Sequence, residues 1–138
     1  TSQKKELENS INEKNLKLPT EINNYIEDLF ARINNADVGF RRKNMPSLLL
    51  RFFKDMYAVL SNCHKLLKKN CQAMIVIGDN RIKIDGHYER IPTTDFVESI
   101  ANQCGLKTEE RIDISVSTEN LLHMKNAITE NVVLRLKK

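Results

Sequence analysis

The sequence contains few glycines and prolines, and their positions exclude one common kind of ligand site. Among the 138 residues there are four glycines and three prolines. They are Gly39, Gly78, Gly86, Gly105, Pro19, Pro46 and Pro92. No Gly-x-Gly sequence occurs, so the glycine-rich loop that cradles a nucleotide phosphate is missing.

Long apolar runs are also missing. No stretch approaches the roughly 18 to 20 apolar residues that a membrane-spanning helix needs, and the N-terminal residues lack the apolar core of a signal peptide. The three cysteines, Cys63, Cys71 and Cys104, are odd in number and widely spaced. That pattern favours reduced thiols in the cytoplasm over a disulfide framework. We therefore expect a cytoplasmic protein without a membrane partner.

Metal-binding and nucleophilic patterns are equally scarce. The sequence has no Cys-x-x-Cys and no His-x-x-x-His. Cys63 and His64 are neighbours on a predicted helix, so their side chains point about 100° apart. The cysteines occupy apolar positions, where a buried and inert thiol is expected. The sequence predicts neither catalytic nor metal-binding residues.

Composition indicates one globular domain with a mild preference for polyanions. The chain is 41% hydrophobic and 29% charged, and its net charge is +4. Residues 1–18 are rich in Lys, Glu and Asn, which predicts a mobile lead-in. Residues 19–138 then form a single α/β domain. A lysine-rich soluble surface explains the charge as well as a nucleic-acid partner does.

Two apolar stripes predict two helices in the first half. From Thr20, the predicted N-cap, apolar residues recur with helical spacing as far as Ile33. A wider stripe predicts a second helix from Ser47 to about Lys69, buried against a sheet and against the first helix.

The second half contains strand signals. The apolar stretch within 72–78 predicts a fully buried strand, and Asp85-Gly86 between alternating segments predicts a hairpin. Pro92 with Thr93 or Thr94 as N-cap begins a helix that Gly105 closes. Further strands are predicted at 111–116 and 131–136, with a short helix or ordered loop at 118–125 between them. The first two sheet strands can be parallel through a right-handed crossover, and the last two antiparallel.

Gly78-Asp79-Asn80 follows the predicted central strand directly. In open α/β sheets, ligands bind beyond the carboxyl ends of the strands. These three residues are therefore candidate substrate contacts. Asp79 is equally well explained as a turn residue that caps the loop.

The combination of these segments resembles the C-terminal half of DNA amino-methyltransferases of the N4-cytosine/N6-adenine type. Residues 76–80 and 91–95 carry the resemblance, together with Gly105, Glu130 and Val133, and it covers roughly residues 45–138. It implies the distal half of a Rossmann-like class I methyltransferase sheet, with two parallel strands, a reversed C-terminal strand and helices on the faces. The implied activity is methyl transfer from S-adenosylmethionine to an exocyclic amino group of a base, as in restriction-modification systems.

Two motifs of that family have no counterpart here. The family binds its cofactor on a glycine-rich loop and performs the transfer with an (Asp/Asn/Ser)-Pro-Pro-(Tyr/Phe/Trp) motif, whereas this sequence has no adjacent prolines. The resemblance therefore implies that S-adenosylmethionine serves the parent enzyme, and that this chain alone binds no cofactor and is inactive. Its partners would be the missing N-terminal half or a second chain.

Basic residues on two segments are candidate nucleic-acid contacts. They are Arg41, Arg42, Lys43, Arg81, Lys83 and Arg90. Contacts from such side chains to phosphates set affinity and register without reading base sequence. A solvated basic loop explains the first three equally well, and DNA and RNA are both compatible with these residues.

Two other functions remain open at this stage. The chain could be a non-catalytic binding or assembly subunit, because an unpaired strand edge at 72–78 would recruit a partner chain or form a homodimer. It could also be part of an RNA methyltransferase, since some tRNA-modifying enzymes share the amino-methyltransferase motif.

Overall fold

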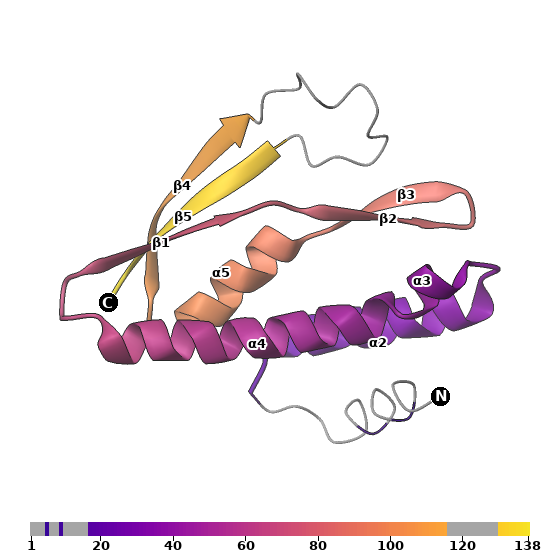
Figure 1. Cartoon of the computed structure of the whole chain (residues 1–138), viewed down its shortest axis with the longest axis horizontal. Helices are drawn as coiled ribbons and strands as arrows, with labels where there is room; N and C mark the ends of the chain where they lie inside the picture. The colour runs from indigo at the N-terminus through magenta and orange to yellow at the C-terminus, as the bar shows by residue number, and fades with distance from the viewer. Residues whose placement is uncertain (1–4, 6–8, 10–16, 116–129) are drawn as a thin grey trace.

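A computed structural model describes residues 5, 9, 17–115 and 130–138, and Figure 1 shows the arrangement of the elements. The helices are α2 (Thr20–Asn35), α3 (Phe40–Lys43), α4 (Met45–Leu66) and α5 (Thr93–Gln103). The strands are β1 (Gln72–Ile77), β2 (Asn80–Ile84), β3 (His87–Ile91), β4 (Lys107–Ser115) and β5 (Glu130–Lys137). The helix or loop predicted at 118–125 and most of the predicted lead-in lie outside the described residues.

The two long helices form where the apolar stripes predict them. On α2, four stripe residues are buried: Ile22, Ile26, Leu29 and Ile33. The N-cap position of α2 is Pro19 instead of the predicted Thr20, and no side-chain hydrogen bond caps the helix. The fixed φ of proline suits a helix start. The second helix, α4, begins at Met45 instead of Ser47, because Pro46 is tolerated in a first turn, where its missing N–H is not needed.

The segment that carries the candidate contacts Arg41, Arg42 and Lys43 forms a short helix. Gly39 precedes the single turn α3, and backbone N–H groups of Arg42 and Lys43 donate to the Gly39 carbonyl. The charged side chains of this turn remain exposed. Helix α3 therefore presents three consecutive cations on a defined backbone.

The main sheet is three-stranded, and the last strand in the sequence lies in its middle. The strand order is β1-β5-β4, and β5 is antiparallel to both neighbours. It follows that β1 and β4 run in the same direction, but they are separated by β5 and do not pair. The shared direction of the first two sheet strands and the antiparallel pairing of the last two agree with the prediction, although no two strands of the described sheet pair in parallel. Burial explains why β5 is central: Leu134 and Leu136, on its inner face, are fully buried.

Strand β1 is not the fully buried strand that its apolar sequence predicts. The side chains of Met74 and Val76 are 66% and 63% exposed. Their neighbours Ile75 and Ile77 point to the other face and pack against the core. Within the described residues the helices cover one face of this sheet only, so the predicted helices on both faces are not present there.

Helix α5 links the sheet to the other helices. It contacts α4 on one side and β4 and β5 on the other, and Figure 1 shows it between them. Gly105 ends this part of the chain with φ +91°, as predicted for a left-handed cap. A Cβ at Gly105 would lie 3.0 Å from Nε2 of His64 on α4, so glycine also permits the close approach of the two helices.

The hairpin forms as predicted. Strands β2 and β3 pair antiparallel around Asp85 and Gly86, which have φ values of +48° and +84°. Two positive φ values match the right-handed twist of the strands, and Asp-Gly is well suited to this turn. Ile82, Ile84 and Ile91 face the core and are buried.

Candidate functional site

The carboxylate of Asp79 caps the N-terminus of α5. Its Oδ1 accepts a hydrogen bond from the backbone N–H of Thr94 at 2.8 Å, and its Oδ2 accepts one from Nε of Arg90. No side chain of α5 itself caps the helix. Because the first N–H groups of a helix lack internal partners, a carboxylate there satisfies a donor and interacts favourably with the helix dipole.

Electrostatics keep Asp79 ionised. Burial alone would raise its pKa, but the hydrogen bonds from Thr94 and Arg90 outweigh burial and hold the pKa below its usual value of 3.8. The Arg90 pKa is raised, chiefly by the hydrogen bond to Asp79. Asp79 is therefore an acceptor and not a candidate proton donor at neutral pH.

An ion network surrounds this cap. Arg90 also donates to Asp95 at 3.3 Å, and Arg111 on β4 donates to Asp95 at 3.0 Å and to Glu98 at 2.9 Å. The network ties β3, α5 and β4 together at the carboxyl end of β1. Arg90, a predicted phosphate contact, is thus engaged in ion pairs, although its side chain is still 59% exposed.

The three residues predicted to contact substrate differ in their exposure and in whether their polar groups already have hydrogen-bond partners. Asp79 uses both oxygens for the cap and the ion pair. Gly78 lies in the connection between β1 and β2 and is half-buried, whereas Asn80 is exposed at the start of β2. The Asn80 amide has no hydrogen-bond partner in the described part of the chain. The turn-capping interpretation accounts for Asp79, and a substrate contact by Asn80 stays a prediction.

Replacing Asp79 with asparagine tests the capping role. The carboxylate contribution is fully present above pH 3.8, the ordinary Asp pKa, and is lost as the pH falls through the lower folded value. We expect Asp79→Asn to lose about 1–2 kcal/mol of unfolding free energy at pH 7. Less should be lost at pH 3, as measured by urea denaturation. Asp113→Asn removes an exposed carboxylate on β4 and is the control; equal losses in both variants would contradict the cap.

The hairpin register brings the predicted basic residues of β2 and β3 to one face. Arg81 pairs with Arg90, and Lys83 pairs with Tyr88, so all four side chains leave the same side. The Lys83 ammonium lies 5.3 Å from the centre of the Tyr88 ring, in a cation–π contact. Tyr88 is 58% exposed. This face therefore combines cations with an accessible aromatic ring.

Figure 1 shows α3 and the hairpin turn at the same end of the molecule. The cations and aromatic rings at this end of the molecule form what we call the basic end. It consists of the half-buried Lys83 and of six exposed residues, Phe40, Arg41, Arg42, Lys43, Arg81 and Tyr88. Phe40 is 79% exposed, so each of the two segments carries an accessible ring beside its cations.

Arg32 on α2 holds the hairpin against the helices. Its guanidinium donates to both oxygens of Glu89 on β3, at 2.6 and 3.0 Å, and to Asp28 at 2.7 Å. The pKa of Arg32 is raised, mainly by the hydrogen bond to Glu89. The sequence alone does not predict this pair, because nothing in the local pattern relates two residues 57 positions apart.

The cysteines are less buried than predicted. Cys71 is exposed in the connection before β1, while Cys63 and Cys104 are half-buried. Burial raises the pKa of the Cys104 thiol, whose Sγ lies 3.9 Å from the Tyr57 carbonyl oxygen. The prediction of buried thiols is wrong for Cys71, because it precedes the strand and not a core position.

The described residues contain neither a cluster of metal ligands nor a membrane-spanning helix. No group of three His, Cys, Asp or Glu side chains there could hold a metal ion. Of the helices that the structure describes, none is both long and apolar enough to cross a membrane.

The outer face of the main sheet carries an apolar surface. Val76, Val133 and Ile112 lie in one cross-strand row, with Met74 and Ile114 on the same face. Ile112 and Ile114 are 41% and 39% exposed. We call these five residues the open sheet face. Strand β1 pairs with β5 alone in the described sheet, so its other edge is available beside this face.

Comparison with solved structures identifies the fold as one shared with a DNA-methylase-like protein. The similar protein is TTHA0409 of Thermus thermophilus, a candidate DNA modification methylase. Its selenomethionine derivative superposes with a TM-score of 0.52 and its complex with S-adenosyl-L-methionine with 0.53, both at 17% sequence identity. No family model matches this sequence, and a search of curated proteins finds no match.

The similarity to TTHA0409 extends over only part of each chain. It covers 64% of this chain but only 37% of TTHA0409. This chain therefore shares a methyltransferase-like fold with a part of that protein.

Proposed function

We propose that this chain is the C-terminal portion of a DNA amino-methyltransferase that uses S-adenosylmethionine. The observation that carries the proposal is the superposition on a DNA-methylase-like protein over 64% of the chain. The strand followed by Gly78-Asp79-Asn80, and the Pro92-Thr93-Thr94-Asp95 helix start that Asp79 caps, support the amino-methyltransferase type through the sequence resemblance.

The described residues do not fit S-adenosylmethionine. The carboxylate at the end of β1 is occupied by Thr94 and Arg90, and the sequence has no glycine-rich loop to approach the cofactor. It has no Pro-Pro motif for the transfer step either. In this proposal, cofactor binding and methyl transfer belong to another segment or another chain.

The exposed surfaces of the main sheet support an incomplete domain. Met74 and Val76 are apolar, extensively exposed and adjacent to the unpaired edge of β1. An exposed edge with an apolar face promotes pairing with another strand. We infer that the cofactor-binding portion of the enzyme extends the sheet from this edge.

The basic end supports contact with DNA. Its lysines and arginines can neutralise backbone phosphates, and Tyr88 and Phe40 can stack on unpaired bases. Arg32 fixes the hairpin on α2 through Glu89, so these cations are presented in a defined arrangement. This part of the proposal assigns positioning of nucleic acid, and not base recognition, to this chain.

The direct test is reconstitution of methyl transfer. The purified chain is mixed with a polypeptide that carries the glycine-rich loop and Pro-Pro motif, and transfer of labelled methyl from S-adenosylmethionine to duplex DNA is measured. We expect transfer only when both are present. Val76→Lys should reduce it at least about tenfold, because a charge on the open sheet face opposes docking. Ser115→Lys, on exposed β4 away from β1, is the matched control.

Three results would count against this proposal. One is micromolar affinity of this chain alone for S-adenosylmethionine, measured by calorimetry. Another is transfer to RNA in place of DNA, which would favour the RNA-modifying alternative. Equal activity of the Val76→Lys and Ser115→Lys variants would contradict assembly at β1.

The unpaired edge of β1 also favours a second candidate function, a non-catalytic assembly subunit. In that case the chain alone should form a symmetric dimer through β1. Light scattering would detect the dimer, and Val76→Lys would convert it to a monomer. A monomeric wild-type chain would exclude the homodimer and leave assembly with a different chain as the form of this alternative.

A further inference from the structure

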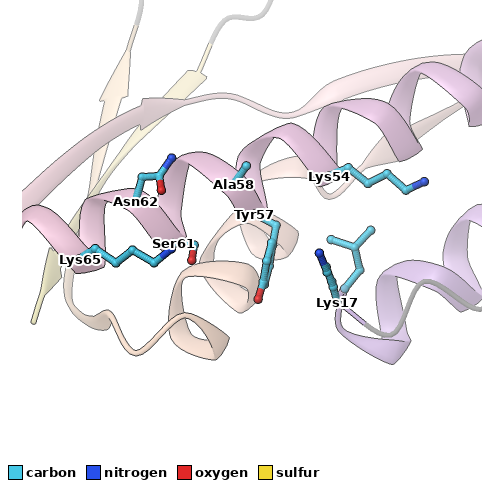
Figure 2. Close-up of a pocket in the computed structure, with 8 residues that line it drawn as sticks. Lys17, Lys54, Tyr57, Ala58, Ser61, Asn62 and Lys65 are labelled. Atoms are coloured by element: carbon cyan, nitrogen blue, oxygen red, sulfur yellow. The ribbon is translucent and has the colours of Figure 1, made fainter.

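A hollow of about 430 Å³ lies between α4 and the residues that lead into α2, away from the basic end and the open sheet face. Figure 2 shows Tyr57 projecting from α4, with Ser61 on one side and Lys17 on the other. Lys54 and Lys65 line the two ends of its α4 wall. The volume falls within the range of small-ligand sites.

The lining of this hollow is positively charged. Three of its eight lining residues are lysines, Lys17, Lys54 and Lys65, and none is an Asp or Glu. No ion pair joins any of the three ammonium groups to a carboxylate in the described part of the chain. A concave surface whose charged lining residues are all cations concentrates positive potential and attracts anions.

Helical spacing creates the α4 wall. Lys54, Ala58, Ser61 and Lys65 recur at i, i+4, i+7 and i+11, so they lie on one face of the helix. The two small residues between the lysines leave the space that the hollow occupies. In Figure 2 the Lys65 side chain runs towards Ser61, while the Lys54 side chain extends in the other direction along α4.

The opposite wall is held in place by the core. Leu18 is only 4% exposed, which anchors the segment that carries Lys17. In addition, Nε2 of Gln103 on α5 donates to the Lys17 carbonyl oxygen at 2.9 Å. The backbone of Lys17 is therefore fixed by two contacts, although its ammonium group is free to rotate.

Neutral polar groups complete the lining. Tyr57, Ser61 and Asn62 also line the hollow, and their hydroxyl and amide groups have no hydrogen-bond partner in the described residues. Hydroxyl and amide groups also donate hydrogen bonds to phosphate oxygens, although each bond is weaker than one from an ammonium group. The Tyr57 ring and Ala58 add an apolar wall, which suits a ligand that carries more than a bare anion.

From this arrangement we propose that the hollow binds a phosphate-bearing anion. Lys17 and Lys65 contact the phosphate oxygens, Lys54 swings in on its flexible stem, and Ser61 and Tyr57 donate hydrogen bonds. The phosphate belongs either to a free nucleotide or to a nucleic-acid backbone. The site stands independently of the proposed methyltransferase role, since it uses neither β1 nor the basic end.

Binding of pyrophosphate, a nucleoside triphosphate and a short single-stranded oligonucleotide to the full chain tests the site. We expect saturable binding of at least one probe, with amide NMR shifts clustered around Tyr57, Ser61 and Lys65. The double variant Lys17→Gln/Lys65→Gln should bind that probe about five- to tenfold more weakly, since each exposed charge pair contributes modestly. Binding should also weaken with added salt.

The control variant is Lys69→Gln/Lys107→Gln, which removes the same charge from two exposed lysines outside the hollow. It should retain wild-type affinity. Gln103→Ala should weaken binding without removing charge, because it releases the Lys17 backbone. Equal affinity of the two double variants, or shifts spread over the whole surface, would overturn the proposal. Binding of pyrophosphate and the triphosphate would identify a free anion as the ligand, and binding of the oligonucleotide alone would identify the backbone.

Discussion

Replacing Phe53 with alanine should lower the unfolding free energy by about 3–5 kcal/mol, the usual cost of truncating a buried phenylalanine. Phe53 is 0% exposed on α4. Its ring meets Phe96 of α5 edge-to-face, with centroids 5.5 Å apart, and Phe96 in turn meets Tyr25 of α2 at 5.1 Å. The substitution leaves a cavity where the three helices meet, and edge-to-face contacts are lost as well.

Urea denaturation followed by circular dichroism measures this effect, and Phe52→Ala provides the control. Phe52 is the adjacent residue on the same helix but is 37% exposed, so its truncation should cost about 1 kcal/mol or less. Similar losses in the two variants would mean that α4 packs with a different face from the one described.

Removing three cations from the basic end should weaken nucleic-acid binding about 100-fold at roughly 0.1 M salt. Each phosphate contact contributes roughly −0.7 to −0.9 to the slope of log affinity against log salt concentration. The variant is Arg41→Gln/Arg42→Gln/Arg81→Gln, in which all three side chains are exposed and have no ion-pair partner among the described residues. Its slope should therefore be shallower than that of the wild type by about 2 to 3.

Fluorescence anisotropy with labelled oligonucleotides over a salt series measures both affinity and slope. The control is Lys68→Gln/Lys69→Gln/Lys107→Gln, which removes equal charge from exposed lysines elsewhere. If net charge alone drove binding, both triple variants would lose affinity equally, and the assignment of the basic end would be wrong.

Local chemistry determined the elements that the sequence predicted well. The spacing of Ile22, Ile26, Leu29 and Ile33 sets the buried face of α2 without reference to any other segment. Asp85-Gly86 likewise determines the hairpin, because its two positive φ values are a property of the turn itself. The turn in addition sets the register of β2 and β3, and this register decides which side chains share a face with Tyr88.

Strand burial and strand order depended on the rest of the fold. The apolar run of β1 predicted burial on both faces, yet helices cover only the face of Ile75 and Ile77. Period-two alternation states which residues share a face, but not whether anything lies against that face. Placing β5 between β1 and β4 likewise required the long-range ladders on both of its edges.

In the candidate site, too, some features follow from the sequence alone and others only from the tertiary structure. Sequence alone determined that Asp79 follows a strand and that cations cluster at 41–43 and on the hairpin. Only the tertiary structure decided that Asp79 caps α5 through Thr94, that Arg32 reaches Glu89, and that Lys17 and Lys65 line the same hollow. The physical reason is range: turn and helix preferences act between near neighbours in the chain, whereas these contacts join segments that only packing of the core brings together.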